Sequence, residues 1–264
     1  MKVSIYQVDA FTKKVFGGNS AAICPLDKWL PEDLMQRIAM ENNLAETAYI
    51  VKEDEGFRIR WFTPTVEVDL CGHATLASAH VFFNHLQYPS QEIVFNSKSG
   101  PLRVLKGESG KLTLDFPKDQ YEKTDDPPAE LHEGLGINIV EVIKGSTDFL
   151  VITDSQKNIE RIVPDLRTIA KIKSRGVIVS ARGEDVDFVS RCFFPQSGID
   201  EDPVTGSAHT LLTPYWAQIL GKNKLTAQQL SGRKGELECE LSGNRVLISG
   251  YAATYMLGVA ELPG

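Results

Sequence analysis

Residues 60–74 read RWFTPTVEVDLCGHA, and residues 191–208 read RCFFPQSGIDEDPVTGSA. Each segment presents an arginine, aromatic residues, a proline, an acidic turn and a glycine in the same order, and the second needs only a short insertion before its glycine. A double match of this kind indicates an internal repeat. The chain of 264 residues is therefore expected to fold as two similar halves.

Each repeat ends where an apolar segment begins. Residues from Gly72 to about Phe83 are nearly free of charge, which predicts a helix that is buried on every side. Residues 207–220 predict a second such helix, with Gly221 as its C-terminal stop and Pro214 as the site of a kink. A helix buried all round needs a sheet around it, so each half is expected to be a curled sheet or small barrel.

Short alternating apolar runs predict the strands of these sheets. The runs are residues 3–8, 57–62, 111–116, 149–153, 176–180, 188–193, 236–241 and 245–249. Turn residues at 107–110 and 242–244 indicate antiparallel hairpins. A further helix is expected to begin at Pro31, with Leu34 and Ile38 on one face.

The predicted fold class is α+β, with two pseudo-symmetric barrel-like domains, each a curled and mainly antiparallel sheet around a central helix. A polar segment at 117–130, which contains two consecutive prolines, is the candidate linker. We therefore predict an N-terminal domain of residues 1–118 and a C-terminal domain of residues 119–264, with the C-terminal residues free to pack back onto the first domain.

Composition excludes several functional classes. The net charge of -7 offers no basic surface for nucleic acid. No apolar stretch is long enough to span a membrane, and Asp9 interrupts the region where a signal peptide would be apolar. These two observations predict a cytoplasmic location. The four cysteines are widely spaced, which predicts reduced thiols.

The two helix openings are the first candidates for a functional site. A helix that begins with glycine presents backbone N–H groups and the positive end of its dipole, which together suit a carboxylate or phosphate. Gly72-His73 and Gly206-Ser207 would form one anion trap if the halves faced each other. The alternative is that both glycines only allow close packing, and the repetition favours the functional interpretation.

Glu46 is the candidate acid-base residue. It lies among small and apolar residues at the entry to a strand, where desolvation disfavours a charged carboxylate unless it is used. The alternative is a surface glutamate beside a loop.

Metal and thiol chemistry are disfavoured by the sequence. The run Asp200-Glu201-Asp202 has no histidine before the helix, and Cys71 with His73 supplies too few ligands for zinc. A racemase with paired thiols needs a second cysteine, but counting from the glycines places Thr205 opposite Cys71. We expect neither a metal nor an organic cofactor.

Several short motifs together resemble the PhzF family of phenazine-biosynthesis-like proteins. They are residues 9–11 (DAF), 16–19 (FGGN), 43–48 (NLAETA), 69–75 (DLCGHAT) and 201–208 (EDPVTGSA). The resemblance spans the whole chain and implies the diaminopimelate-epimerase-like fold, in which the active site lies between two barrel domains.

The resemblance also implies roles for individual residues. Carried over by position, Glu46 is the catalytic glutamate, His73 the active-site histidine, Asp202 the aspartate and Ser207 the helix-opening serine. In the phenazine enzyme these residues move a proton within a dihydro-hydroxyanthranilate, without metal or organic cofactor, in a homodimer. Asn19 and Ser20 fall in the substrate-binding loop, although relatives often have proline where this chain has Ser20.

The sequence thus predicts a cofactor-independent isomerase that acts on a small carboxylic acid. Glu46 would shuttle the proton, with His73 and Asp202 orienting polar groups and the two helix openings binding anionic groups. An amino-acid racemase or epimerase of the same fold is the first alternative. A non-catalytic protein that binds a small anion for regulation is the second, and the intact Glu46 argues against it because a carboxylate repels anions.

Overall fold

The computed structural model describes residues 1–54 and 56–262 and divides the chain into two compact units. Unit 1 contains residues 1–115 together with the segment from Ser249 onward, and unit 2 contains Phe116–Ile248. No helix in the described part of the chain is long and apolar enough to cross a membrane.

The predicted domains are residues 1–118 and 119–264, whereas the division in the structure falls after Asp115. The segment after Ser249, which the prediction left free to pack onto the first domain, joins unit 1 because its strand pairs with the first strand of the chain, from Lys2↔Glu261 to Ala10↔Ala252. The predicted linker at 117–130 lies in unit 2 and carries a short strand, Tyr121–Lys123, which pairs within that unit.

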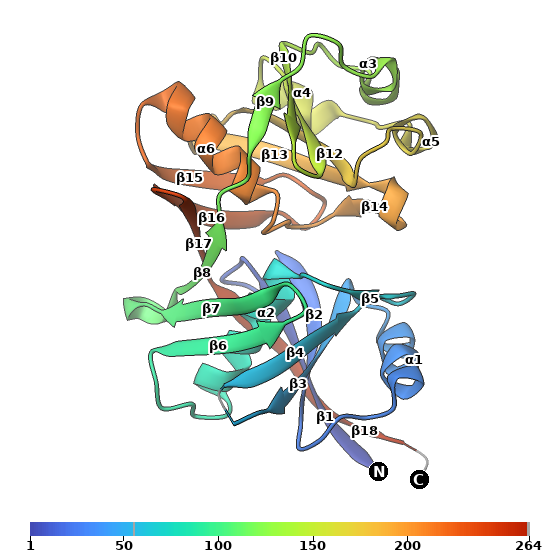
Figure 1. Cartoon of the computed structure of the whole chain (residues 1–264), viewed down its shortest axis with the longest axis vertical. Coiled ribbons are helices and arrows are strands. Elements are labelled where there is room, and N and C mark those ends of the chain that lie inside the picture. Colours follow the sequence, from blue (N-terminus) through green and yellow to red (C-terminus); the bar gives the residue numbers. More distant parts are fainter. Residues whose placement is uncertain (55, 263–264) are drawn as a thin grey trace. The chain divides into compact units, whose positions relative to one another are not determined.

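Unit 1 is a curled sheet around one helix (Figure 1). Its elements are β1 (Lys2–Ala10), β2 (Asn19–Leu26), α1 (Glu32–Asn42), β3 (Glu46–Lys52), β4 (Phe57–Phe62), β5 (Glu67–Val68), α2 (Gly72–Asn84), β6 (Glu92–Ser97), β7 (Gly100–Lys106), β8 (Leu112–Pro117, which crosses the boundary) and β18 (Ala252–Glu261). Helix α2 packs against β1, β2, β3, β7 and β18. The outer helix α1 begins one residue after the predicted Pro31, which is its N-cap.

Unit 2 repeats this plan (Figure 1). Its elements are β9 (Tyr121–Lys123), α3 (Ala129–Leu135), β10 (Glu141–Gly145), β11 (Asp148–Ile152), α4 (Gln156–Arg161), α5 (Leu166–Ile169), β12 (Gly176–Arg182), β13 (Phe188–Phe194), β14 (Ile199–Asp202), α6 (His209–Leu220), β15 (Lys224–Gln229), β16 (Gly235–Ser242) and β17 (Arg245–Gly250, which crosses the boundary). The short helices α3, α4 and α5 were not predicted, because each is too short to show a helical period.

The strand pairings confirm the internal repeat. In unit 1, β1–β2 is antiparallel, β2–β3 parallel, β3–β4 and β4–β5 antiparallel, β4–β6 parallel and β6–β7 antiparallel. In unit 2, β10–β11, β11–β12, β12–β13, β13–β14, β13–β15 and β15–β16 follow the same order of directions. The matched sequence segments therefore occupy equivalent places in two similar sheets.

The arginine of each repeat makes the same contacts. Arg60 Nε donates to Glu67 Oε1 at 2.7 Å, and its guanidinium lies 5.2 Å from the ring centre of Phe62. Arg191 Nε donates to Glu201 Oε1 at 2.7 Å, and its guanidinium lies 5.1 Å from the ring centre of Phe193. In both units the arginine thus ties the long strand to the short strand that leads to the buried helix.

Both predicted central helices are present. In α2, residues 72–79 and 81–83 are buried, as their composition predicts. Helix α6 begins at His209, two residues later than predicted, and Gly221 ends it in the left-handed conformation. Pro214 lacks the N–H that would bond to the Thr210 carbonyl, and the backbone N–H of Asp119 donates to that carbonyl at 3.2 Å instead.

The Arg60–Glu67 pair predicts an acid-sensitive step in the stability of unit 1. Hydrogen bonding from Arg60, opposed by burial and helped by Lys98, lowers the pKa of Glu67 to about 2. Because the folded pKa lies below the unfolded value near 4.5, the stabilisation is present above pH 4.5 and is lost as the pH falls towards 2.

Glu67→Gln is therefore expected to flatten the dependence of unfolding free energy on pH between about 4.5 and 2, by an amount on the order of 2 kcal/mol. Urea unfolding at several pH values measures this. Glu261→Gln is the matched control, because that side chain is 75% exposed in its pair with Lys2. If the unfolding free energy depends on pH in the same way in both variants, the acid-sensitive step does not belong to Glu67.

Candidate functional site

The opening of α2 gathers three buried side chains in unit 1. Glu46 is the first residue of β3, Cys71 is the N-cap of α2, and His73 is the second residue of that helix. Their exposed fractions are 8%, 6% and 4%. The side chain of Cys71 makes no capping hydrogen bond, and the N–H groups of the first helical turn have no partner within the helix. The structure thus brings together the predicted Glu46 and His73.

Glu46 and His73 form a close acid–imidazole pair. Glu46 Oε2 lies 2.9 Å from His73 Nε2, which is ion-pair distance without the alignment of a full hydrogen bond. Burial acts to lower the pKa of His73, but the neighbouring Cys71 and Glu46 outweigh it and hold the pKa well above its usual value. A carboxylate and an imidazole in this position can share one proton.

Asn19 supports this pair from β2. Its side chain is fully buried, and Asn19 Nδ2 lies 3.1 Å from His73 Nδ1. An amide can donate to an unprotonated Nδ1 or, after a flip, accept from a protonated one, so it orients the ring in either state. The neighbouring Ser20 is not brought to His73, since its hydroxyl accepts from Gln7 Nε2 at 3.3 Å and successive strand residues face opposite sides.

The same cluster contains three potential metal donors, one more than the sequence indicated. One donor atom from each of Glu46, Cys71 and His73 lies within 4.8 Å of the others. However, Cys71 Sγ approaches His73 Nδ1 at 3.6 Å, whereas Glu46 approaches Nε2. A single ion cannot use both ring nitrogens, so the arrangement suits proton sharing along a row of groups better than chelation.

Cys71 is not arranged as a reactive thiolate. Burial, with a contribution from the charge of Glu46, raises its pKa to about 11. At neutral pH only about one thiol in 10⁴ would be ionised at such a pKa. His73 and the backbone of Ala74 act to lower the pKa of this thiol, but desolvation outweighs them.

Unit 2 positions Asp202 at the end of β14. Thr205 Oγ1 donates to Asp202 Oδ2 at 2.6 Å, and Gln229 Nε2 donates to the Asp202 carbonyl at 2.7 Å. Gln229 Oε1 also accepts from the Thr205 backbone N–H at 2.8 Å. The buried Gln229 therefore fixes the loop between the predicted Asp202 and the Gly206-Ser207 turn, a role that no pattern around residue 229 indicated.

Two further residues join Ser207 in unit 2. Arg175 Nη1 donates to Ser207 Oγ at 3.1 Å, while Arg175 Nε and Nη2 both donate to the carboxylate of Asp148. Asp148 is 4% exposed. Sequence reasoning missed both residues, because a lone charge at the start of a strand usually belongs to a solvated loop. The run of small residues that singled out Glu46 is absent before Gly176.

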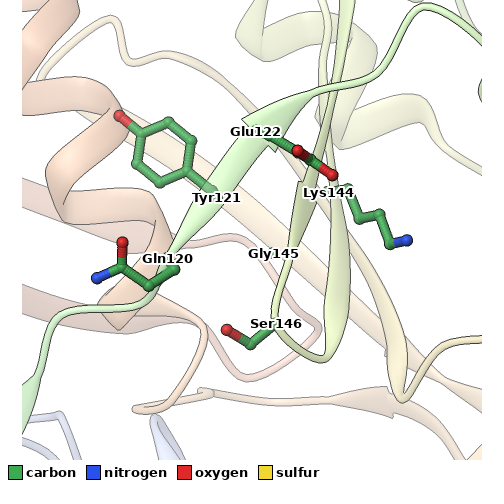
Figure 2. A pocket seen from close by; sticks show the side chains of 6 residues that line it. All are labelled: Gln120, Tyr121, Glu122, Lys144, Gly145 and Ser146. Carbon is green, nitrogen blue, oxygen red and sulfur yellow. The ribbon is translucent and has the colours of Figure 1, made fainter.

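A separate pocket of about 290 Å³ lies in unit 2 beside the β10–β11 turn (Figure 2). It is lined by Gln120, Tyr121, Glu122, Lys144, Gly145 and Ser146. None of the predicted site residues lines it. Lys144 lies directly opposite Glu122 in the β9–β10 pairing, so the pocket does not present an uncompensated charge.

Comparison with known proteins gives the same result as the motifs. The family model described as phenazine biosynthesis-like protein (PhzC-PhzF) matches residues 8–258. An uncharacterized isomerase of Pseudomonas aeruginosa is 51% identical over 262 residues, which cover 99% of this chain and all of the relative. The chain belongs to the PhzF family.

Solved structures agree with this assignment. A PhzF-family crystal structure from Enterococcus faecalis aligns with a TM-score of 0.95 and 47% identity, over 99% of this chain and all of that one. A structure described as a predicted epimerase from Pseudomonas aeruginosa aligns with a TM-score of 0.79 at 21% identity over 99% of both chains, and shows the shared fold alone. The chain is thus an isomerase of the PhzF family with the epimerase-like α+β fold.

Proposed function

We propose that this protein moves a proton between carbon atoms of a small carboxylic acid, without metal or organic cofactor. The observation that supports this most directly is the buried Glu46–His73 pair at the opening of α2. A carboxylate held at 8% exposure has lost most of its hydration, and its neighbour is an imidazole that can take up or return a proton.

The proton transfer needs only groups of this chain. Glu46 removes a proton from an acidic carbon, the electron pair moves into the adjacent unsaturated system, and the resulting carboxylic acid returns the proton to a second carbon. The sum is an isomerisation with no net change in oxidation state. His73, with Nε2 2.9 Å from Glu46 Oε2, can take up or return a proton beside that carboxylate. Asp202 and Ser207 are proposed to orient polar groups of the substrate.

A racemase with two opposed thiols is a weaker proposal. The pKa of Cys71, about 11, leaves too little thiolate for that role at neutral pH. A purely regulatory anion-binding protein also explains the helix openings, but it does not explain a buried carboxylate beside one of them.

Incubation of the protein with mixtures of carboxylic acids in deuterated water, followed by mass spectrometry, tests the proposal. We expect deuterium at a carbon-bound position, or a new isomer, in at least one acid. The absence of label and of new isomers, together with saturable binding of an acid, would instead favour the regulatory protein.

We also propose that the protein is a homodimer, with the exposed face of β18 as the contact to a second copy. Tyr255, Leu257 and Val259 follow one another at every second position of β18 and are 48%, 60% and 57% exposed, and such a row of apolar side chains is costly in water. Sedimentation equilibrium should give twice the chain mass of 29.2 kDa. Leu257→Glu should shift the equilibrium to the monomer.

A further inference from the structure

The loop of residues 11–18 joins β1 to β2 and leads directly to the Glu46–His73 pair. The last pair of the β1–β2 ladder is Ala10↔Asn19, and Asn19 Nδ2 lies 3.1 Å from His73 Nδ1. The side chain that orients the imidazole therefore stands where this loop ends. The two sequence motifs at residues 9–11 and 16–19 lie at the two ends of the same loop.

Asp9 is buried on the face of the sheet that points away from His73. It pairs with Ser20, whereas the next residue, Ala10, pairs with Asn19. Paired residues of antiparallel strands share a face and successive residues alternate, so Asp9 and Asn19 lie on opposite faces. Asp9 is only 2% exposed. A carboxylate at this burial is strongly disfavoured unless hydrogen-bond donors replace its hydration.

The loop supplies such a donor from its far end. The backbone N–H of Phe16 donates to Asp9 Oδ2 at 2.8 Å, which draws the second half of the loop back towards β1. The beginning of the loop is held separately, because the backbone N–H of Thr12 donates to the carbonyl of Tyr251 at 3.1 Å. The path of the loop is thus fixed at both ends by hydrogen bonds.

The backbone conformation of Phe16 depends on this contact with Asp9. Its φ of 72° lies in the left-handed region, which is unfavourable for a residue with a bulky side chain. Phe16 is also 71% exposed, so burial of its ring compensates little of that cost. The hydrogen bond to a buried carboxylate is the stronger reason for the conformation, because such charge-assisted bonds are about twice as strong as neutral ones.

Gly18 connects the loop to Asn19. Its φ of 61° is left-handed, and a Cβ at this position would overlap the carbonyl oxygen of Ala10. The loop therefore closes tightly on the last residue of β1, one position before Asn19. Because little space remains there, a displacement of the loop must also move the backbone of Asn19.

We propose that Asp9 is a positioning residue, which holds Asn19 in place through the loop of residues 11–18 and thereby orients the ring of His73 towards Glu46. The inference rests on the proposed function, because it assigns a supporting residue to the same acid–imidazole pair. It concerns the ring of His73, whose state can be measured without turnover.

The test follows the titration of the His73 ring by ¹⁵N NMR in the full chain, with His73→Gln to identify its signal. Asn19→Ala removes the contact with Nδ1 and should shift the titration midpoint by about half a pH unit or more, the size expected for loss of one hydrogen bond. Asp9→Ala should shift it in the same direction by a similar amount. Asp9→Asn keeps an oxygen for the Phe16 N–H and should stay near the parent value.

Three further variants keep the test decisive. The double variant Asp9→Ala/Asn19→Ala should titrate as Asn19→Ala alone does, because Asp9 acts through residue 19. Gly18→Ala displaces the same loop while leaving Asp9 in place, and it should also shift the midpoint if Asp9→Ala fails to fold. Asp27→Ala is the matched control, since Asp27 is exposed just beyond the other end of β2, and it should leave the titration unchanged.

An unchanged His73 midpoint in both Asp9→Ala and Gly18→Ala would overturn the proposal, even if both variants lost thermal stability, because Asp9 would then support only the fold. A further shift in the double variant would also overturn it, since Asp9 would act on the ring independently of Asn19. In either case, deuterium incorporation by the parent protein would leave the proposed function standing. The expected shifts in a protein that incorporates no deuterium would instead contradict the proposed function and support the positioning role.

Discussion

Replacing Glu46 with glutamine is expected to lower the rate of deuterium incorporation by about 10² to 10⁴-fold, the range that a general acid-base group supplies. Glutamine preserves the shape of the side chain and its hydrogen-bonding capacity but cannot carry a proton. The initial rate of label uptake into the responding acid, measured by mass spectrometry, gives the effect directly.

The same substitution should change the titration of His73. Burial alone lowers the pKa of a histidine, and the charge of Glu46 is one of the contributions that raise it. Glu46→Gln should therefore lower the pKa of His73, which side-chain NMR can follow. This readout separates loss of the acid-base pair from a general loss of folding.

Cys71→Ala is the matched comparison at the same helix opening. Its thiol is buried and protonated at neutral pH, so the side chain serves mainly as packing. Activity should persist within roughly tenfold, with the main loss in stability. If Cys71→Ala is inactive while Glu46→Gln retains activity, the protein transfers protons through a thiol and the carboxylate mechanism is wrong.

The sequence predicts much of this fold because the repeated segment and the apolar helix that follows it are both local patterns. Arg60 and Arg191 belong to matched segments, and each segment ends in a glycine that opens an apolar helix. Alternation of apolar residues then predicts the strands, while hydrogen bonds between sequence-distant strands lie beyond such reasoning. The register of β18 on β1 is one example, since the prediction left the C-terminal residues free to pack onto the first domain but gave no pairing for them.

The candidate site was predictable only where a local pattern exists. Glu46 stands out as an acid among small residues, and His73 as a histidine in a buried helix. Arg175 and Gln229 have ordinary surroundings in the sequence, and their importance comes from contacts with residues 32 and 24 positions away. Asn19 was predicted to bind substrate, and in the structure its side chain lies against the ring of His73.

The largest stability effect is expected from Arg191→Met. The side chain of Arg191 is 13% exposed and makes two hydrogen bonds with Glu201 and two with the backbone carbonyls of Ile159 and Ile162. Its removal leaves a partly buried carboxylate without its cation, a change that typically costs about 3 to 5 kcal/mol. The equivalent Arg60→Met should cost less, because Lys98 remains beside Glu67 at 2.7 Å.

Fluorotryptophan NMR during urea unfolding can measure the stability of both variants, because each of the two units contains at least one of the three tryptophans. Trp29 and Trp61 lie in unit 1, and Trp216 lies in unit 2. Arg191→Met should lower the unfolding midpoint of the Trp216 signal, whereas Arg60→Met should affect the Trp61 signal to a smaller extent. Glu201→Gln added to Arg191→Met should recover part of the loss, since the unpaired charge is then removed.

Arg191 also connects this stability to the site. Glu201 immediately precedes Asp202 on β14, so the ion pair fixes the strand end from which the Asp202 side chain extends. Arg191→Met should therefore reduce deuterium exchange even at urea-free, fully folded conditions, and the double variant should restore stability more than activity. A double variant that regains both in equal measure would show that the pair contributes only to folding and does not position Asp202.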